Sequence, residues 1–372
     1  MQLSVKNLLL TMLVFGLFSC ASNSQTTTAD DLPSRSDTQL VLNNAILEQS
    51  NKQENTVWKI KAKSIVYTED KQKAILETVT GNLWQGDEII LKISAESGEV
   101  VDNGDVIFLK DNIVATATQN GTVVRSNNIE WRPQENTLIV SDNLSAVNTE
   151  MEVVAKSGKY HTDREQLELE TEVIATVFEP ALQLTSDRLT WNIPLDLAII
   201  PSNLEIVRYQ EDETISDRVV AERAKIELTK KIATLTDNIE LVSLDPKLQI
   251  ATNSLSWNYE RRIGIAEQPI QIIDRDRQLD ITGNRGEINF PEQIARLSGG
   301  VKGLNTKDVA RLYARELVWN LDTEIVEANG SVAYQQTKPQ VNLTGEKAVG
   351  NIAEQNIVVS GGKKQVTSTI EQ

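Results

Sequence analysis

The chain has 372 residues and a formal net charge of −16, because 53 Asp and Glu outnumber 37 Lys and Arg. Nucleic acid requires a basic surface, so this balance argues against a nucleic-acid partner. One cysteine and one histidine exclude an internal disulfide, a cysteine metal cluster and a three-histidine metal site.

The N-terminus carries a targeting pattern. An apolar run of 11 residues, Leu8 to Phe18, follows Lys6. A membrane-spanning helix needs about 20 apolar residues, so the run instead fits the core of a signal peptide. It ends in Leu17-Phe18-Ser19-Cys20, which resembles a bacterial lipobox. We therefore expect a signal peptide over residues 1–19 and a lipid on Cys20. The alternative is a free thiol in a signal peptide that is cleaved elsewhere.

Residues 20–37 are polar and lack apolar periodicity. They predict a flexible tether between the lipid and a folded domain. A coil of about 20 residues spans roughly 25 Å, which is enough to clear the lipid headgroups.

From residue 38 onward, apolar residues alternate with polar ones and turn residues separate the runs, which is typical of β-strands. The pattern is clearest in Leu182–Val207, where Pro194 and the turn 201–203 divide three strands. A strand that ends in Trp recurs with spacings of 60, 66 and 62, at Trp131, Trp191, Trp257 and Trp319. Each period divides in two, which predicts about ten tandem units of about 30 residues between residues 58 and 362.

Each unit contains a short corner that we expect to reverse or bend the strand. Asn, Asp and Gly tolerate the left-handed backbone that such corners need. The predicted corners are Gly81-Asn82, Asp111-Asn112, Asp142-Asn143, Ser202-Asn203, Asp237-Asn238, Gly299-Gly300 and Asn329-Gly330.

Alternate units differ at one pair of positions. Odd units have a large pair there: Ile65/Tyr67, Ile129/Trp131, Leu189/Trp191, Leu255/Trp257 and Leu317/Trp319. Even units place a small residue first: Gly98/Val100, Gly158/Tyr160, Ala224/Ile226, Gly286/Ile288 and Ala348/Gly350. Large residues facing small ones fill a narrow interior, so we predict two antiparallel sheets folded like a V and extended along one axis.

We expect one all-β domain over residues 38–362, followed by a polar tail over 363–372. The longest Trp spacing coincides with the acidic segment Gln210–Ser216. This segment is either a surface insertion or a junction between two sub-domains near 209–218.

The lead-in VWKIKAKSIVY and the corner-plus-strand segments DNIVATA, DNLSAV and DNIELV resemble the LptC family. That family is the membrane-anchored periplasmic component of the lipopolysaccharide export ABC transporter and shares the OstA-like fold with LptA. The resemblance covers residues 38–362. It implies an elongated open β-jellyroll, or β-taco, whose apolar trough carries acyl chains. Implied partners are lipopolysaccharide, the inner-membrane permeases and an LptA-like bridge. Two departures are the lipobox in place of a transmembrane helix and a longer chain.

The resemblance makes the large pairs candidates for the trough lining: Ile65, Tyr67, Ile129, Trp131, Leu189, Trp191, Leu255, Trp257, Leu317 and Trp319. The same residues would also form the dry core of a filled sandwich, and the sequence leaves both open. The last strand carries Ile357, Val358 and Val359 and is a candidate edge for a partner strand. Alternatively, the following segment Gly361–Lys364 blunts that edge.

The chain has no GxxxxGK[ST] phosphate loop and no Ser or Cys motif around His161. We expect a non-enzyme without cofactor or metal. The alternatives are a structural or adhesive β-repeat lipoprotein and a carbohydrate-active enzyme on a β-helix. Ala21 after Cys20 favours the outer membrane by the enterobacterial sorting rule, whereas the resemblance favours the inner membrane, which we adopt.

Substituting Cys20→Ser should leave an uncleaved or soluble precursor, because acylation requires the thiol. Metabolic labelling with radioactive palmitate tests this. Label that persists in the variant would contradict the lipoprotein assignment.

Overall fold

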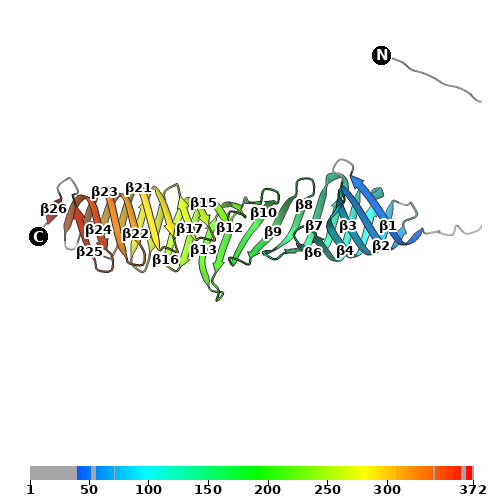
Figure 1. Ribbon diagram of the computed structural model, residues 1–372, viewed down its shortest axis with the longest axis horizontal. Coiled ribbons are helices and arrows are strands. Elements are labelled where there is room, and N and C mark those ends of the chain that lie inside the picture. The colour runs from blue at the N-terminus through cyan, green and yellow to red at the C-terminus, as the bar shows by residue number, and fades with distance from the viewer. Residues whose placement is uncertain are drawn as a thin grey trace, which may run out of the picture. The chain divides into compact units, whose positions relative to one another are not determined.

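The computed structural model describes residues 40–51, 56–70, 72–307, 309–337, 340–361 and 366–370. These residues form 26 strands and two short 3-10 turns, η1 (Asp102–Gly104) and η2 (Pro133–Glu135), with no α-helix among them. Residues Gln39–Gln372 make one compact unit. Cys20, the expected signal peptide and the expected tether lie outside the described residues. Within the unit the strands follow one another along one axis (Figure 1), which confirms the predicted elongated all-β fold.

The strands belong to a single sheet, and each pairs antiparallel with its neighbours in that sheet. Strands of 10 to 14 residues cross a bend in this sheet. They are β1 (Val41–Asn51), β2 (Thr56–Tyr67), β3 (Lys73–Gln85), β4 (Glu88–Val101), β5 (Val106–Ala117), β6 (Val123–Arg132), β7 (Thr137–Val147), β8 (Met151–His161), β9 (Gln166–Val177), β10 (Leu182–Asn192), β15 (Ile232–Leu244), β16 (Lys247–Asn258), β21 (Ile294–Asn305), β22 (Ala310–Asn320), β23 (Ile325–Gln336) and β24 (Val341–Asn351).

Shorter strands stay on one side of the bend. Arm A contains β12 (Leu204–Tyr209), β13 (Ile215–Ala221), β18 (Ile270–Asp274), β19 (Leu279–Gly283) and β26 (Thr367–Ile370). Arm B contains β11 (Leu197–Ile200), β14 (Arg223–Glu227), β17 (Ile263–Ala266), β20 (Arg285–Asn289) and β25 (Asn356–Ser360). Each long strand contributes one segment to each arm.

The bend is made by residues with a left-handed backbone in the middle of the strands. Asp142 and Asn143 have φ values of 61° and 64°, and the pairing of β7 with β8 skips between Ser141 and Leu144. Such a bulge leaves residues unpaired and turns the strand. The same arrangement confirms three other predicted corners, at Asp111-Asn112, Asp237-Asn238 and Gly299-Gly300.

The remaining corner predictions need correction. Gly81-Asn82 is wrong, because the bend falls at Thr78, with a φ of 51°. The predicted Asn329-Gly330 corner is displaced by one residue, to Gly330-Ser331. The predicted Ser202-Asn203 corner instead links β11 to β12 without a left-handed residue.

The bend of β9 was missed. Thr171 and Glu172 have φ values of 66° and 52° there. Neither residue type marks a left-handed position in a sequence, so the conformation is held by the pairing on both sides.

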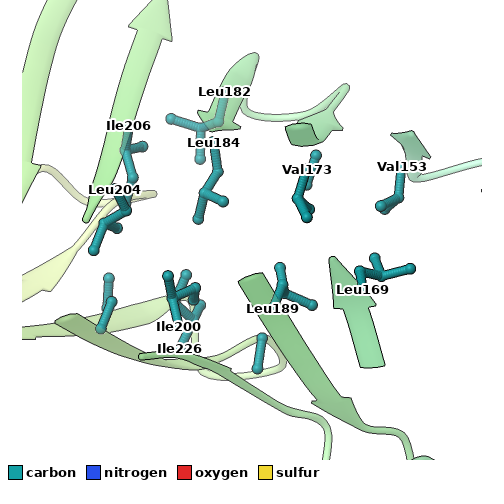
Figure 2. Close-up of a cluster of buried hydrophobic side chains, with 14 of the residues drawn as sticks. Val153, Leu169, Val173, Leu182, Leu184, Leu189, Ile200, Leu204, Ile206 and Ile226 are labelled. Carbon is teal, nitrogen blue, oxygen red and sulfur yellow. The ribbon is translucent and has the colours of Figure 1, made fainter. Parts of the chain in front are cut away.

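The inner faces of the two arms pack against each other. Figure 2 shows one row of apolar side chains that includes Leu182, Leu184, Leu204 and Ile206, opposite another that includes Leu169, Leu189, Ile200 and Ile226. Small residues leave room for large ones across this interface. A Cβ on Gly286 would lie 2.9 Å from Ile270 Cγ2, and one on Gly158 would lie 3.1 Å from Leu144 Cδ1.

Small residues do face large ones across the interior, as predicted. However, the small residues of the even units do not face the large pairs of the odd units. Gly158 and Gly286 lie on arm B, as do the large pairs of the odd units. Each half-unit of the chain crosses both arms, so equivalent residues of successive half-units become neighbours within one arm.

Two further segments, the expected polar tail and the acidic segment at Gln210, have a defined structure. Strand β26 lies within the expected polar tail and pairs with β24, and its four residues are too few for a visible alternation. The acidic segment that begins at Gln210 forms the tip of the β12–β13 hairpin, where the Gln210 N–H donates to the Thr214 carbonyl at 2.8 Å. This hairpin projects beyond its neighbours (Figure 1).

Substituting Gly98→Ala should destabilise the protein by about 1–3 kcal/mol, the usual range for overpacking. A Cβ there would lie 2.9 Å from the Phe108 carbonyl oxygen and 3.2 Å from Leu76 Cδ1. The backbone oxygen cannot rotate away. The control is Gly303→Ala, where the nearest atom is 3.7 Å away. Urea unfolding of both variants tests this, and equal stability would contradict the close packing.

Candidate functional site

All ten residues predicted to line the interior lie on arm B. Tyr67 and Trp191 are half-buried. The other eight are at most 7% exposed: Ile65, Ile129, Trp131, Leu189, Leu255, Trp257, Leu317 and Trp319. The structure therefore brings the whole set together as one wall of the interior.

The opposite wall, on arm A, was not identified from the sequence. Its buried residues come in pairs two positions apart, such as Leu182/Leu184, Leu248/Ile250, Ile270/Ile272 and Leu279/Ile281. The signal was present, because these pairs occupy the strand segment before or after each corner with the same alternation. The two walls touch, as the ring centroids of Trp58 and Trp131 lie 5.1 Å apart. Together they form one apolar cluster that extends from Trp58 to Leu321.

The interior indoles have no hydrogen-bond acceptor. Their Nε1 atoms are buried without a partner among the described residues, on Trp58, Trp131, Trp191, Trp257 and Trp319, as is that of Trp84. Buried Trp N–H groups usually find an acceptor. Apart from these N–H groups both walls are aliphatic or aromatic, so most of their affinity for a guest would be non-directional.

The C-terminal end of the interior is lined by smaller side chains. Ala314, Ala328, Val332 and Ala348 form a separate buried cluster. A cavity of about 190 Å³ opens beside it. The three candidate edge residues point to opposite faces of β25. Ile357 and Val359 pack against the cluster, while Val358 is 69% exposed. Strands β25 and β26 each pair only with β24 among the described residues.

The free ends of the two arms face each other along a mouth, on the side opposite the bend. Turns of arm B follow an exact repeat there. Subtracting residue numbers gives a spacing of 31 between successive left-handed residues, Lys231, Arg262, Gln293, Glu324 and Gln355. The carbonyl of one such residue accepts the N–H of the next turn, as from Phe290 to Arg262 at 3.2 Å. Sequence analysis did not detect this repeat, because Lys, Arg, Gln and Glu are not typical residues of left-handed turn positions.

Two ion pairs cross the mouth. Arg262 of arm B donates to Asp217 of arm A from Nη2 at 2.8 Å and from Nε at 3.0 Å. Arg277 of arm A donates to Glu324 of arm B at 2.6 Å. Asp217 is only 1% exposed. The other ion pairs of the described residues stay within one arm or lie at the bend. These two, which we call clasps, therefore link the arms across the mouth.

On the N-terminal side of the Arg262 clasp, the mouth opens into a cavity of about 2140 Å³, which we call the mouth cavity. Its lining includes Phe178 and Arg208 from arm A, and Trp191, Leu228 and Tyr259 from arm B. Burial raises the pKa of Tyr259 to about 12, with a further contribution from nearby carboxylates. Its phenol therefore stays neutral at physiological pH.

The described residues contain no group of three His, Cys, Asp or Glu side chains that could hold a metal ion. No helix within the same ranges has the length and hydropathy to cross a membrane.

A family model described as "Lipopolysaccharide-assembly, LptC-related" matches residues 7–148 and 202–306. The unmatched interval, 149–201, contains Phe178 and Trp191 of the mouth cavity. A search of curated proteins found no match.

Substituting Asp217→Asn should destabilise the protein on the order of 3 kcal/mol, because it leaves the Arg262 guanidinium without a charge partner. The Arg262 side chain is only 19% exposed. The control is Glu287→Gln, which breaks a pair with Arg296 that is more than 40% exposed on both sides. Exposed pairs contribute less than about 1 kcal/mol. Urea unfolding that gave the two variants the same stability would show that the clasp does not hold the mouth.

Proposed function

We propose that this chain, which belongs to the LptC-related family of lipopolysaccharide-assembly proteins, binds acyl chains between its arms and passes them along its interior. The family acts in lipopolysaccharide transport, and its members are periplasmic and associated with the inner membrane. They are transport components and are not known as enzymes.

The continuous apolar interior carries the proposal. Its two walls are joined at the bend, by the long strands and by short links such as the one from β11 to β12. The arms could therefore part while each keeps its pairing. Each methylene transferred from water into such an interior gains about 0.8 kcal/mol. Because this gain requires no fixed polar contact, a bound chain can slide, which a conduit requires.

The walls are in contact in this structure, so an acyl chain would have to take the place of contacts between the arms. Two places already provide space. One is the mouth cavity, and the other is the cavity beside Ala328 and Ala348 at the C-terminal end. We propose that the second is the exit, because it lies next to the last strands.

The unpaired edges of β25 and β26 would receive a strand of an LptA-like bridge. An edge strand presents backbone N–H and C=O groups that a partner strand can pair with. Ile357 and Val359 would then continue the interior lining into the partner, and Val358 would contact it from the outside.

We further propose that lipopolysaccharide arrives from the inner-membrane permeases and that a lipid on Cys20 keeps the chain at that membrane. The support is the lipobox-like sequence together with the family's location. Separating inner from outer membranes and probing each for the chain tests this. Recovery in the outer membrane would contradict it.

Substituting Leu255→Gln should lower the affinity for a fluorescent fatty-acyl probe several-fold, since an amide on the wall cannot be paired when a chain passes it. Leu255 is 3% exposed, so stability should also fall by about 1–3 kcal/mol. The control is Leu244→Gln, at a position that is 51% exposed. Probe affinity and melting temperature are measured on each folded variant.

The two measurements distinguish an interior that binds acyl chains from one that is only a packed core. Under the proposal the probe also raises the melting temperature of the unmodified chain, because it binds only the folded state. If the folded Leu255→Gln protein bound the probe normally, the interior would be a core, and acyl chains would have to bind elsewhere.

A further inference from the structure

Arg208, in the lining of the mouth cavity, has no ion-pair partner among the described carboxylates. Arg208 donates from Nη1 to Ser216 Oγ at 3.2 Å, while its Nε is buried without a partner. The neighbouring carboxylate, Asp217, is engaged by Arg262 through both of its oxygens. No carboxylate of the described residues forms an ion pair with Arg208. Two guanidinium groups thus lie near one buried carboxylate, which pairs with only one of them.

This imbalance disfavours the charged side chain. Burial, followed by the neighbouring Arg262, lowers the pKa of Arg208, and Asp217 opposes that effect. A half-buried guanidinium with free donors is stabilised by an anion, and phosphate matches its planar fork. The inner part of the cavity therefore fits an anionic group.

An apolar surface lies in the same cavity. Trp191 is half-buried, unlike Trp131, Trp257 and Trp319, which are at most 4% exposed. Phe178, in the turn after β9, is 47% exposed. Leu228 lines the cavity between them and the core. Aromatic side chains that are partly exposed in the lining of an open cavity are suited to contact a hydrocarbon chain.

The outer part of the cavity is acidic. Glu150, Glu179 and Glu260 line it with exposed side chains, as do Glu211, Asp212 and Glu213 at the tip of the β12–β13 hairpin. These carboxylates would repel a ligand with several negative charges. They would attract a cation attached to the same ligand, a few bonds outside its anionic group.

We propose that the mouth cavity binds a zwitterionic amphiphile from the side. Its acyl chain lies against Trp191 and Phe178, its phosphate diester on Arg208, and its ammonium group at the acidic outer carboxylates. The proposal rests on the lipid-handling function proposed above and gives the conduit a lateral opening between its ends. Phe178 and Trp191 fall in the interval that the family model does not match, whereas Arg208 and the acidic tip of the β12–β13 hairpin fall in a matched interval.

The test uses the full-length protein and a lysophosphatidylethanolamine with one fluorescent acyl chain, kept below its critical micelle concentration. Fluorescence anisotropy reports binding. Arg208→Gln should weaken binding about tenfold or more, as expected for a lost charge-assisted hydrogen bond. The matched control is Arg218→Gln, at a side chain that is 55% exposed and paired with Glu205. It should bind like the unmodified chain.

A second variant tests the contact between the ligand's ammonium group and the outer carboxylates. The replaced residues are exposed, so the core stays intact. The triple substitution Glu211→Gln, Asp212→Asn and Glu213→Gln should weaken lysophosphatidylethanolamine binding. It should strengthen binding of lysophosphatidic acid with the same chain, which lacks the ammonium group. Circular dichroism confirms that each variant is folded.

Several results would overturn the proposal. One is unchanged lysophosphatidylethanolamine affinity in Arg208→Gln. Another is parallel rather than opposite effects of the triple substitution on the two lipids. Displacement of the probe by inorganic phosphate as effectively as by the lipid would leave an anion site only.

A fluorescent fatty-acyl ester, which carries no charge, is the neutral probe that keeps this inference separate from the proposed conduit. If Arg208→Gln binds that probe normally and loses lysophosphatidylethanolamine, both proposals are supported. If the unmodified chain binds lysophosphatidylethanolamine in an Arg208-dependent way but not the neutral probe, the interior conduit fails and the mouth site stands.

Discussion

The bend in the middle of the sheet determines the rest of the structure. Residues with left-handed backbones, such as Asp142 and Asn143, interrupt the pairing of long strands and fold one sheet into two arms. A flat sheet with this sequence would expose one apolar face along its whole length. Folding buries that face against itself, and no α-helix of the described residues covers it. The interior, its mouth and its open ends are all consequences of this one device.

Because the bends succeed one another along the chain, the fold behaves as a one-dimensional stack. Each strand is hydrogen-bonded only to its neighbours in the stack, so stability accumulates unit by unit. Closure of the mouth does not accumulate in this way. It depends on individual side chains, Arg262 with Asp217 and Arg277 with Glu324, which lie in the C-terminal half. The two halves of the chain therefore share one backbone design but differ in how firmly the arms are held together.

The sequence predicted what local patterns determine and missed what pairing determines. Alternation in segments such as Leu182–Val207 predicted the strands, and Asp-Asn pairs predicted three bends. The bends at Thr78 and at Thr171-Glu172 were missed, because ordinary residues are held left-handed there by strands on either side. The Trp repeat located the arm B wall, but the partners on arm A become visible only once the chain is folded. Likewise, Arg262 and Asp217 are 45 residues apart, and no local signal connects them.

The unit-by-unit bend has a consequence for how a guest could move. A rigid tube must open along its entire length, or be open permanently, to admit a chain. Under the proposed function the arms would part locally at a few successive bends, so only the units that hold the guest would need to separate. The work of separation then scales with the length of the guest and not with the length of the path. The free energy needed to separate the arms at any moment would then be the same for a long path as for a short one. The separated region would move along the sheet together with the bound chain.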